Sequence, residues 1–247
     1  WNWKAANAQG SSNTDGSINT TYTSVNTAAG FSISTYTGNG SNGATVGHGL
    51  GAIPDTVWIK RLSNADGMIV YHSAYGNNAS VKMDRDGTSE GNFWNSTTPT
   101  SSVVTITNST ECNSNGQTYV MYAFAPKKGY SRFGKYVGNG NADGNFIYTG
   151  FKPAFIMVKN ITSTAIWMLY DNKRDTDGNP NRKSLMPSET NAEDVNAESL
   201  DFLSNGFKTR AVGVKLNDNS QTFLYWAFAA EPLVANVGAN GLPATAQ

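Results

Sequence analysis

The sequence predicts an all-β protein made of two tandem antiparallel β-sandwiches of the lectin or jelly-roll kind. Short runs of strand-forming residues are separated by turns rich in Gly and Asn along most of the chain, a pattern typical of β-sandwiches. Three blocks of sequence also return in the same order: Tyr36–Gly40 as Tyr136–Gly140, Pro54–Lys60 as Pro153–Lys159, and Asn113–Ala125 as Asn217–Ala229. An ordered recurrence of this kind indicates a tandem duplication.

The repeat also accounts for the first residues of the chain. Trp1–Ala5 resembles the final strands of the two repeats, which are Tyr122–Pro126 and Trp226–Ala230. We therefore predict that the chain opens on the closing strand of a truncated upstream repeat and that the sequence is the C-terminal piece of a longer protein. The predicted organisation is a closing strand with a connector (1–30), a first sandwich (31–128), a second sandwich (129–232) and a tail (233–247).

Runs of alternating or β-branched residues place the individual strands. In the first repeat the predicted strands are 31–36, 55–61, 68–73, 80–83, 103–107 and 118–125. In the second repeat they are 133–136, 155–159, 167–170, 206–210 and 222–229. A short helix is considered only for Ser188–Leu203. The closing strands carry apolar residues on both faces, as in Tyr122, Ala123 and Phe124, and this predicts central strands buried on both sides.

Composition argues against several classes of function. Eighteen basic and eighteen acidic residues cancel, so no electrostatic feature favours binding to nucleic acid. No apolar run approaches the length of a membrane span, so membrane insertion is not expected. The single cysteine, Cys112, excludes internal disulfides and a multi-cysteine zinc site. A weakly charged surface rich in Asn, Thr and Gly is typical of β-proteins that work outside cells, including virion proteins.

The sequence shows no pattern of a catalytic site. His48 and His72 are the two histidines, and His72 ends a strand whose counterpart in the second repeat ends at Asp171. Because a catalytic base is seldom replaced by a carboxylate between copies, we interpret His72 and Asp171 as polar strand ends. No two carboxylates are paired by the sequence in a way that suits glycan cleavage. We therefore predict a protein without enzymatic activity.

One loop suggests a metal ion. Asp175, Asp177 and Asn179 place oxygen-bearing side chains at alternate positions around Gly178, as in calcium-binding loops. Asp-Gly is also a common turn, and the terminal bidentate Glu of a calcium loop is missing. Calcium is thus the one candidate cofactor, with Asp175, Asp177 and Asn179 as its candidate ligands.

Aromatic side chains outside the predicted strands suggest carbohydrate binding, because such rings stack on sugars. Tyr75, Trp94 and Tyr130 are in this position, although aromatic residues also close the ends of sandwiches. The candidate residues for ligand binding are Tyr75, Trp94, Asp171, Asp175 and Asn179. Residues 160–196 depart most from the first repeat, so a function specific to the second repeat is expected there.

Several motifs resemble a known family. They are Trp1–Ala5, Asn13–Ile18, Gly30–Ile33, Tyr36–Gly40, Val46–Gly51, Gly129–Ser131, Tyr148–Ala154, Leu203–Lys208 and Ala227–Ala229. These blocks are similar to an uncharacterised repeat module at the C-terminal end of large virion proteins of tailed bacteriophages, common in phages of marine bacteria. The resemblance implies a virion surface protein of the tail-fibre, adhesin or head-decoration type. It brings no catalytic motif with it, and it implies a homo-oligomer, with a trimer expected as in many phage fibres.

Two hypotheses of different class follow. The first is a non-enzymatic host-recognition module of a tail fibre or adhesin, which binds glycans of the host surface. The second is a structural module that decorates a capsid or tail and contacts other virion proteins. A third hypothesis, a polysaccharide depolymerase, requires a catalytic carboxylate such as Asp84 or Asp175. In all three hypotheses the protein lies on the virion surface.

Overall fold

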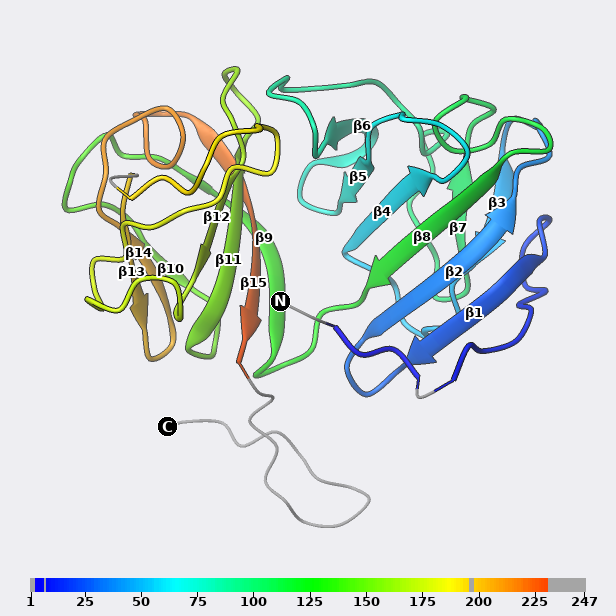
Figure 1. Cartoon of the computed structure of the whole chain (residues 1–247), viewed down its shortest axis with the longest axis horizontal. Helices are drawn as coiled ribbons and strands as arrows, with labels where there is room; N and C mark the ends of the chain where they lie inside the picture. The colour runs from blue at the N-terminus through cyan, green and yellow to red at the C-terminus, as the bar shows by residue number, and fades with distance from the viewer. Residues whose placement is uncertain (1–2, 7, 196–197, 231–247) are drawn as a thin grey trace, which may run out of the picture. The chain divides into compact units, whose positions relative to one another are not determined.

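The computed structural model describes residues 3–6, 8–195 and 198–230. These residues form fifteen β-strands and no helix, so the predicted all-β class is confirmed. The described residues divide into two compact units: those up to residue 85 and those of 89–126 form the first, and those of 86–88 and from residue 127 to residue 230 form the second. Figure 1 shows that each unit is built from layers of antiparallel strands.

The first unit contains a six-stranded and a two-stranded sheet. The larger sheet has the order β1 (Thr20–Asn26), β2 (Phe31–Thr37), β8 (Thr118–Phe124), β4 (Thr56–Arg61), β5 (Ile69–His72) and β6 (Gly76–Lys82). The smaller sheet consists of β3 (Ala44–Gly47) and β7 (Val103–Ile106). Val46 and Val104 of the small sheet share one buried cluster with Ile59 and Met121 of the large sheet. The apolar faces of the two sheets thus form the core of a sandwich.

The second unit has the same two-layer plan. Its four-stranded sheet has the order β12 (Met168–Asp171), β11 (Pro153–Asn160), β15 (Thr222–Ala229) and β9 (Ser131–Val137). Its three-stranded sheet has the order β10 (Phe146–Tyr148), β14 (Gly206–Thr209) and β13 (Leu200–Leu203). Ile147 and Phe207 of the small sheet pack in one buried cluster with Ile156 and Tyr225 of the large sheet.

A buried asparagine organises the same turn in both units. In the first unit, Asn113 Oδ1 accepts the backbone N–H of Asn39, and the hydroxyl of Tyr36 donates to the Cys112 carbonyl. The second unit repeats these two hydrogen bonds between Asn217 and Asn139 and between Tyr136 and Leu216. Blocks that recur in the sequence therefore make equivalent contacts in the two units.

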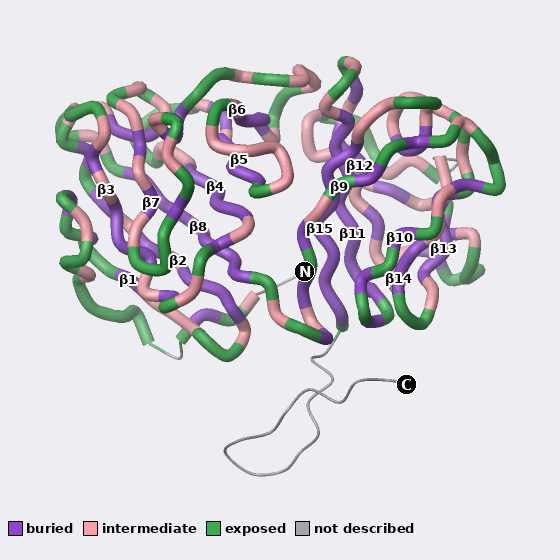
Figure 2. Tube along the Cα trace, turned by 180° about the vertical axis from the view of Figure 1, so that it is seen from behind, coloured by how far each residue is buried: buried purple, intermediate pink, exposed green. Residues whose placement is uncertain are grey.

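The predicted closing strands, β8 and β15, lie inside their sheets. β8 pairs with β2 and β4, and β15 pairs with β9 and β11. In β15 every residue from Phe223 to Ala229 is buried, and Figure 2 shows this strand as a continuous purple tube. Burial on both faces of this central strand is thus confirmed for the second unit, and its run of apolar residues explains it.

The N-terminal region differs from the prediction. β1 falls within residues 1–30, where a connector was expected, and it pairs along its length with β2 at the edge of the first sheet. The described residues of Trp1–Ala5 lie in no strand. Instead, the ring of Trp3 packs against Phe31, Trp58 and Phe124. This segment therefore contributes aromatic packing, and the predicted closing strand is not observed there.

Three further strands lie outside the predicted set, namely β3, β10 and β13. β13 replaces the helix considered for Ser188–Leu203, because Leu200 and Phe202 alternate into the buried cluster while the strand pairs with β14. The first unit ends at Pro126, two residues before the predicted boundary. The tail predicted for 233–247 lies outside the described residues.

Candidate functional site

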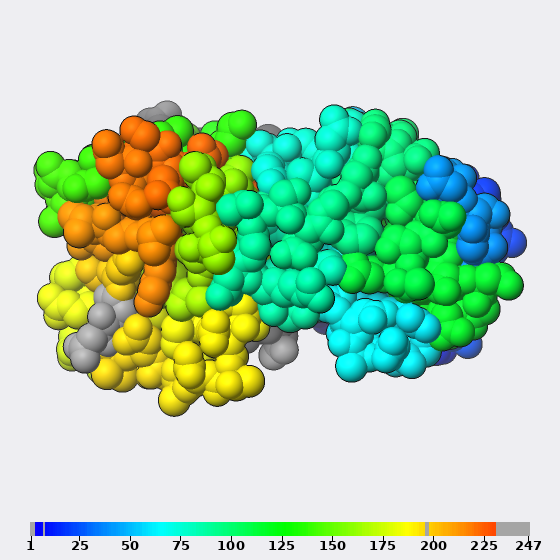
Figure 3. Space-filling model, turned by 90° about the horizontal axis from the view of Figure 1, so that it is seen from above, coloured from blue at the N-terminus to red at the C-terminus, as the bar shows by residue number. Residues whose placement is uncertain are grey.

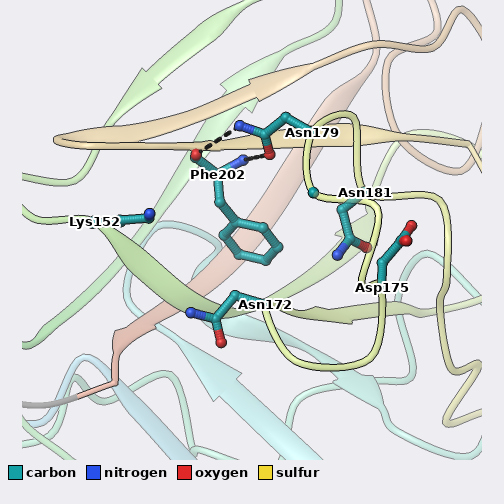
Figure 4. Close-up of a pocket in the computed structure, with 7 residues that line it drawn as sticks. Lys152, Asn172, Asp175, Asn179, Asn181 and Phe202 are labelled. Carbon is teal, nitrogen blue, oxygen red and sulfur yellow. Dashed lines mark hydrogen bonds between the residues drawn. The ribbon is translucent and has the colours of Figure 1, made fainter.

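A cavity of about 190 Å³ opens in the second unit beside the loop that follows β12. Its lining residues are Lys152, Asn172, Asp175, Gly178, Asn179, Asn181 and Phe202. Lys152 precedes β11, Phe202 belongs to β13, and the loop supplies the rest. Figure 4 shows the Phe202 ring between Lys152 on one side and Asn181 with Asp175 on the other. In Figure 3 the chain after β12, coloured yellow, lies at the surface of the molecule.

Aspartate side chains organise the loop. Asp171 Oδ1 accepts the backbone N–H of Lys173 at 2.9 Å, and Asp175 Oδ1 accepts that of Asp177 at 3.2 Å. Both are turns in which an aspartate side chain bonds the backbone two residues on. Asp175 Oδ2 also accepts the backbone N–H of Arg182 at 2.7 Å. The N–H groups of Arg182 and Asp177 hold the pKa of the Asp175 carboxyl below its ordinary value, so this group remains a carboxylate.

Two asparagines tie the loop to neighbouring strands. Asn179 Nδ2 donates to the Phe202 carbonyl at 3.0 Å, and Asn179 Oδ1 accepts the Phe202 N–H at 2.9 Å. Asn181 is 1% exposed, and its Nδ2 donates to the Asp171 carbonyl at 3.0 Å. These bonds hold the loop against β12 and β13 and give the cavity a fixed wall.

Two of the lining asparagines carry a buried oxygen that has no hydrogen-bond partner among the described residues. These atoms are Asn172 Oδ1 and Asn181 Oδ1. The orientation of the Asn181 amide follows from its bond to the Asp171 carbonyl, since only the nitrogen of the amide donates. A buried acceptor without a donor costs roughly 1–3 kcal/mol. A hydrogen-bond donor of a ligand that reaches these atoms would satisfy them.

The first unit is built differently at the corresponding place. Ser73 and Asn172 donate their N–H groups to equivalent backbone carbonyls, which aligns the two units here. In that alignment Ile53, 55% exposed, stands where the second unit has Lys152. In the first unit β6 begins shortly after β5, whereas the second unit has a longer loop at this place, which contains residues 172–181. The lining of the cavity is thus specific to the second unit, within the region where the sequence departs from the first repeat.

The polar strand ends His72 and Asp171 act alike. His72 Nδ1 accepts the backbone N–H of Ala74 at 3.1 Å, just as Asp171 Oδ1 accepts that of Lys173. Each side chain supplies an acceptor to the turn after its strand. This shared task explains the exchange of His for Asp between the units and agrees with their interpretation as polar strand ends.

Trp94 requires a correction. It is 0% exposed, and its ring meets Tyr71 edge-on with centroids 5.5 Å apart, so it offers no face to a sugar. The loop turns inward here because Asn92 Oδ1 accepts the Trp94 N–H. Tyr75 is half-buried in the first unit and does not line the cavity. Tyr130 packs edge-on against Phe228 and so closes an end of its sandwich.

The predicted calcium ligands are occupied by the loop itself. Asp175 accepts backbone N–H groups and Asn179 pairs with Phe202, while Asp177 is exposed and does not line the cavity. The described part of the chain contains no group of three or more His, Cys, Asp or Glu suited to a metal. A turn stabilised by these side chains explains the alternate spacing of Asp175, Asp177 and Asn179, and calcium binding stays a prediction.

Groups with catalytic potential elsewhere are buried in the first unit. His48 is 0% exposed; its Nδ1 accepts the Leu50 N–H, so Nε2 donates to the Thr100 carbonyl, 3.1 Å away. Burial lowers the pKa of His48 and raises that of the Cys112 thiol to about 12. A neutral histidine with both nitrogens bonded and a protonated thiol are structural groups.

The candidate ligand-binding residues that were selected from the sequence do not include Lys152, Asn172, Asn181 or Phe202. Asn172 and Asn181 flank the lengthened loop, and that lengthening is the signal that points to them. Lys152 and Phe202 come from distant parts of the chain, and only the arrangement of β11 and β13 brings them to the loop.

A second surface lies where β9 and β10 form the edges of their sheets. We call Arg132, Val137, Phe146 and Tyr148 the open edge. Val137, Phe146 and Tyr148 are 55%, 47% and 55% exposed, and the Arg132 guanidinium lies 5.6 Å from the centre of the Tyr148 ring. This arrangement leaves two aromatic rings in contact with solvent.

The first unit covers the equivalent edge with its own chain. There β1 pairs with β2, and Ser17 exchanges hydrogen bonds with Thr45 of β3. Asn13 of this covering segment packs closely on Gly47, because a Cβ atom on Gly47 would lie 1.6 Å from Asn13 Oδ1. By strand register, the second unit has Phe146 and Tyr148 in place of Thr45 and Gly47. Aromatic residues thus replace the small residues that the covering chain requires.

Comparison with known protein families finds a match for most of the chain. The family model of the domain of unknown function DUF7483 matches residues 1–232 and thus includes both units. No curated protein and no solved structure matches the chain. Within the described residues, no helix is long and apolar enough to cross a membrane. Because the family model covers nearly the whole chain, the protein belongs to the DUF7483 family, whose function is unknown.

Proposed function

We propose that the protein is a non-enzymatic recognition module that binds a carbohydrate in the cavity beside residues 172–181. The observation that carries the proposal is that Asn172 and Asn181, each with a buried and unpartnered side-chain oxygen, line a cavity together with an aromatic ring. Sugar hydroxyls donate hydrogen bonds to such oxygens, and the C–H face of a sugar packs on an aromatic ring. The volume of about 190 Å³ is below that of sites for drug-sized molecules, so a single sugar ring fits best.

The carboxylate content of the cavity supports recognition over hydrolysis. Asp175 is the only carboxylate among the described residues that line it, and glycosidases of the common kind need two. The lowered pKa of Asp175 also makes it a poor general acid near neutral pH. A depolymerase therefore gains no support from this site.

We extend the proposal to the biological setting that the sequence resemblance implies. The module would belong to a tail fibre or adhesin on a bacteriophage virion, where it would recognise a glycan of the host surface. Homo-oligomerisation, with a trimer as the expected form, belongs to the same proposal. The support is the resemblance of the sequence blocks named above, together with a content of charged residues of only 15%.

The test is a screen of the purified chain on arrayed bacterial polysaccharides and their oligosaccharides, followed by calorimetry on those that bind. Asn172→Ala removes one unpartnered acceptor without breaking a side-chain hydrogen bond. We expect a loss of affinity of about tenfold, which corresponds to about 1.4 kcal/mol. Asn78→Ala, at an exposed position on β6, is the matched control. Equal affinity of both variants and the parent would contradict the assignment of this cavity.

The open edge favours the second candidate function, a structural module that contacts other virion proteins. Its exposed aromatic residues, Phe146 and Tyr148, stand where the first unit is covered by its own chain, and such patches mark protein contacts. The apolar faces of the closing strand β15 are buried and therefore do not provide a surface for contacts with other proteins. Labelling intact virions with an antibody to this chain distinguishes the candidates: label at the distal tail supports host recognition, and label over the capsid supports decoration.

A further inference from the structure

The cavity has a chemical polarity. Lys152 places an ammonium group at one end, and Asn181 with Asp175 places oxygen atoms at the other, with the Phe202 ring between them (Figure 4). Asn172, which also lines the cavity, lies below this ring in the same view. A ligand that fits this order carries an acceptor or a negative charge at one end and hydrogen-bond donors at the other.

The charge of Lys152 is not used by the fold. Its side chain is exposed, and the described residues offer it neither an ion pair nor a hydrogen bond. Asp175, the one carboxylate in the lining, lies across the Phe202 ring and already accepts the N–H groups of Asp177 and Arg182. The ammonium group is therefore free to bind an anionic group of a ligand.

The first unit shows that this position does not need a lysine. The equivalent residue, Ile53, precedes Pro54 as Lys152 precedes Pro153, and it is also exposed. The first unit, which lacks the longer loop, thus folds with an apolar residue at this position. The lysine accompanies the loop of residues 172–181, which points to a role in the cavity.

We propose that the cavity binds a sugar that carries a carboxylate, such as a uronic acid unit of an acidic polysaccharide. The carboxylate pairs with the Lys152 ammonium, the C–H face of the ring packs on Phe202, and hydroxyl groups donate to Asn172 Oδ1 and Asn181 Oδ1. This inference rests on the proposed carbohydrate-binding function and names the chemical class of the sugar.

The experiment compares two ligands and three proteins by calorimetry at low and moderate salt. The ligands are an oligosaccharide of hexuronic acid and the neutral oligosaccharide of the same linkage with hydroxymethyl groups in place of carboxylates. The proteins are the parent chain, Lys152→Ile, which adopts the residue of the first unit, and Lys135→Gln, which removes an exposed lysine of β9 as a control. Thermal unfolding checks that each variant is folded.

We expect the parent to bind the acidic ligand at least tenfold more tightly than the neutral one, and we expect salt to weaken this preference. Lys152→Ile should bind both ligands equally, while Lys135→Gln should behave as the parent. If the neutral ligand binds equally well and Lys152→Ile changes nothing, the acidic-sugar inference fails and the carbohydrate-binding function stands. If neither these ligands nor any arrayed glycan binds, both proposals fail.

Discussion

Replacement of Asn217 by alanine tests the hydrogen-bond set that the two units share. Asn217 is 0% exposed. Its Nδ2 donates to Asn139 Oδ1 at 2.8 Å, to the Asn141 carbonyl at 2.9 Å and to the Ala211 carbonyl at 2.8 Å. Its Oδ1 accepts the Asn139 N–H at 3.2 Å. One side chain thus joins the turn after β9 to the segment before β15.

The expected loss of stability follows from these contacts. The two protons of Nδ2 and the one accepted bond amount to about three net hydrogen bonds, each worth roughly 1 kcal/mol. The carbonyls of Asn141 and Ala211 would also lose a donor. Asn217→Ala should therefore lower the free energy of unfolding by about 3–4 kcal/mol, a large part of the 5–15 kcal/mol that is typical of a domain.

Urea denaturation followed by tryptophan fluorescence measures this loss. Asn219→Ala, at an exposed position two residues away, is the control and should change stability by less than about 0.5 kcal/mol. Asn113→Ala should cost a similar amount, because Asn113 Nδ2 also uses two protons, for Asn39 Oδ1 and the Ser41 carbonyl, and Asn113 Oδ1 accepts the Asn39 N–H. A loss below about 1 kcal/mol for Asn217→Ala would refute the reasoning.

Three further predictions concern the first unit. Trp94→Ala should destabilise the protein by about 3–5 kcal/mol, as for other buried tryptophans, and thermal unfolding checks this. Burial lowers the pKa of His48 in the folded protein below the value in the unfolded chain. The neutral His48 side chain therefore contributes fully to stability above about pH 6.5, and this contribution is lost as the pH falls through the pKa of the folded state. The urea concentration at the midpoint of unfolding should therefore fall more between pH 7 and pH 5 for the parent than for His48→Gln. Equal falls for the two proteins would contradict the contribution of neutral His48 to stability. Cys112, buried and with a pKa of about 12, should react with a thiol reagent only after denaturation; rapid labelling of the native chain would contradict its burial.

The sequence predicts those strands well whose apolar pattern repeats. β4 and β11, and β8 and β15, each lie in recurring blocks, and the structure has them within a residue or two of the predicted bounds. A strand of three or four residues gives only a weak periodic pattern; β3, β10 and β13 were missed, whereas β5, β7, β12 and β14, with four residues each, were predicted. β1 was expected to be part of a connector because its run of Thr and Ser carries little apolar character.

The cavity was only partly predictable. Asp175 and Asn179 were selected for their spacing, and both line the cavity, although their polar atoms bond the backbone. Asn172 and Asn181 matter because their oxygens lack partners, which is a property of the folded chain. Trp94 illustrates the opposite error, since a residue outside the strands can still be buried when its loop turns inward.

The most direct test of the carbohydrate site is an NMR titration of the isotope-labelled chain with an acidic oligosaccharide. The account predicts that shifts concentrate on the side-chain amides of Asn172 and Asn181, on the Phe202 ring and on the backbone of residues 172–181. It also predicts that Asn78 and the turn at Asn113 remain unchanged. Shifts confined to the open edge at Phe146 and Tyr148, with none at the cavity, would contradict the account and would place recognition on the other surface.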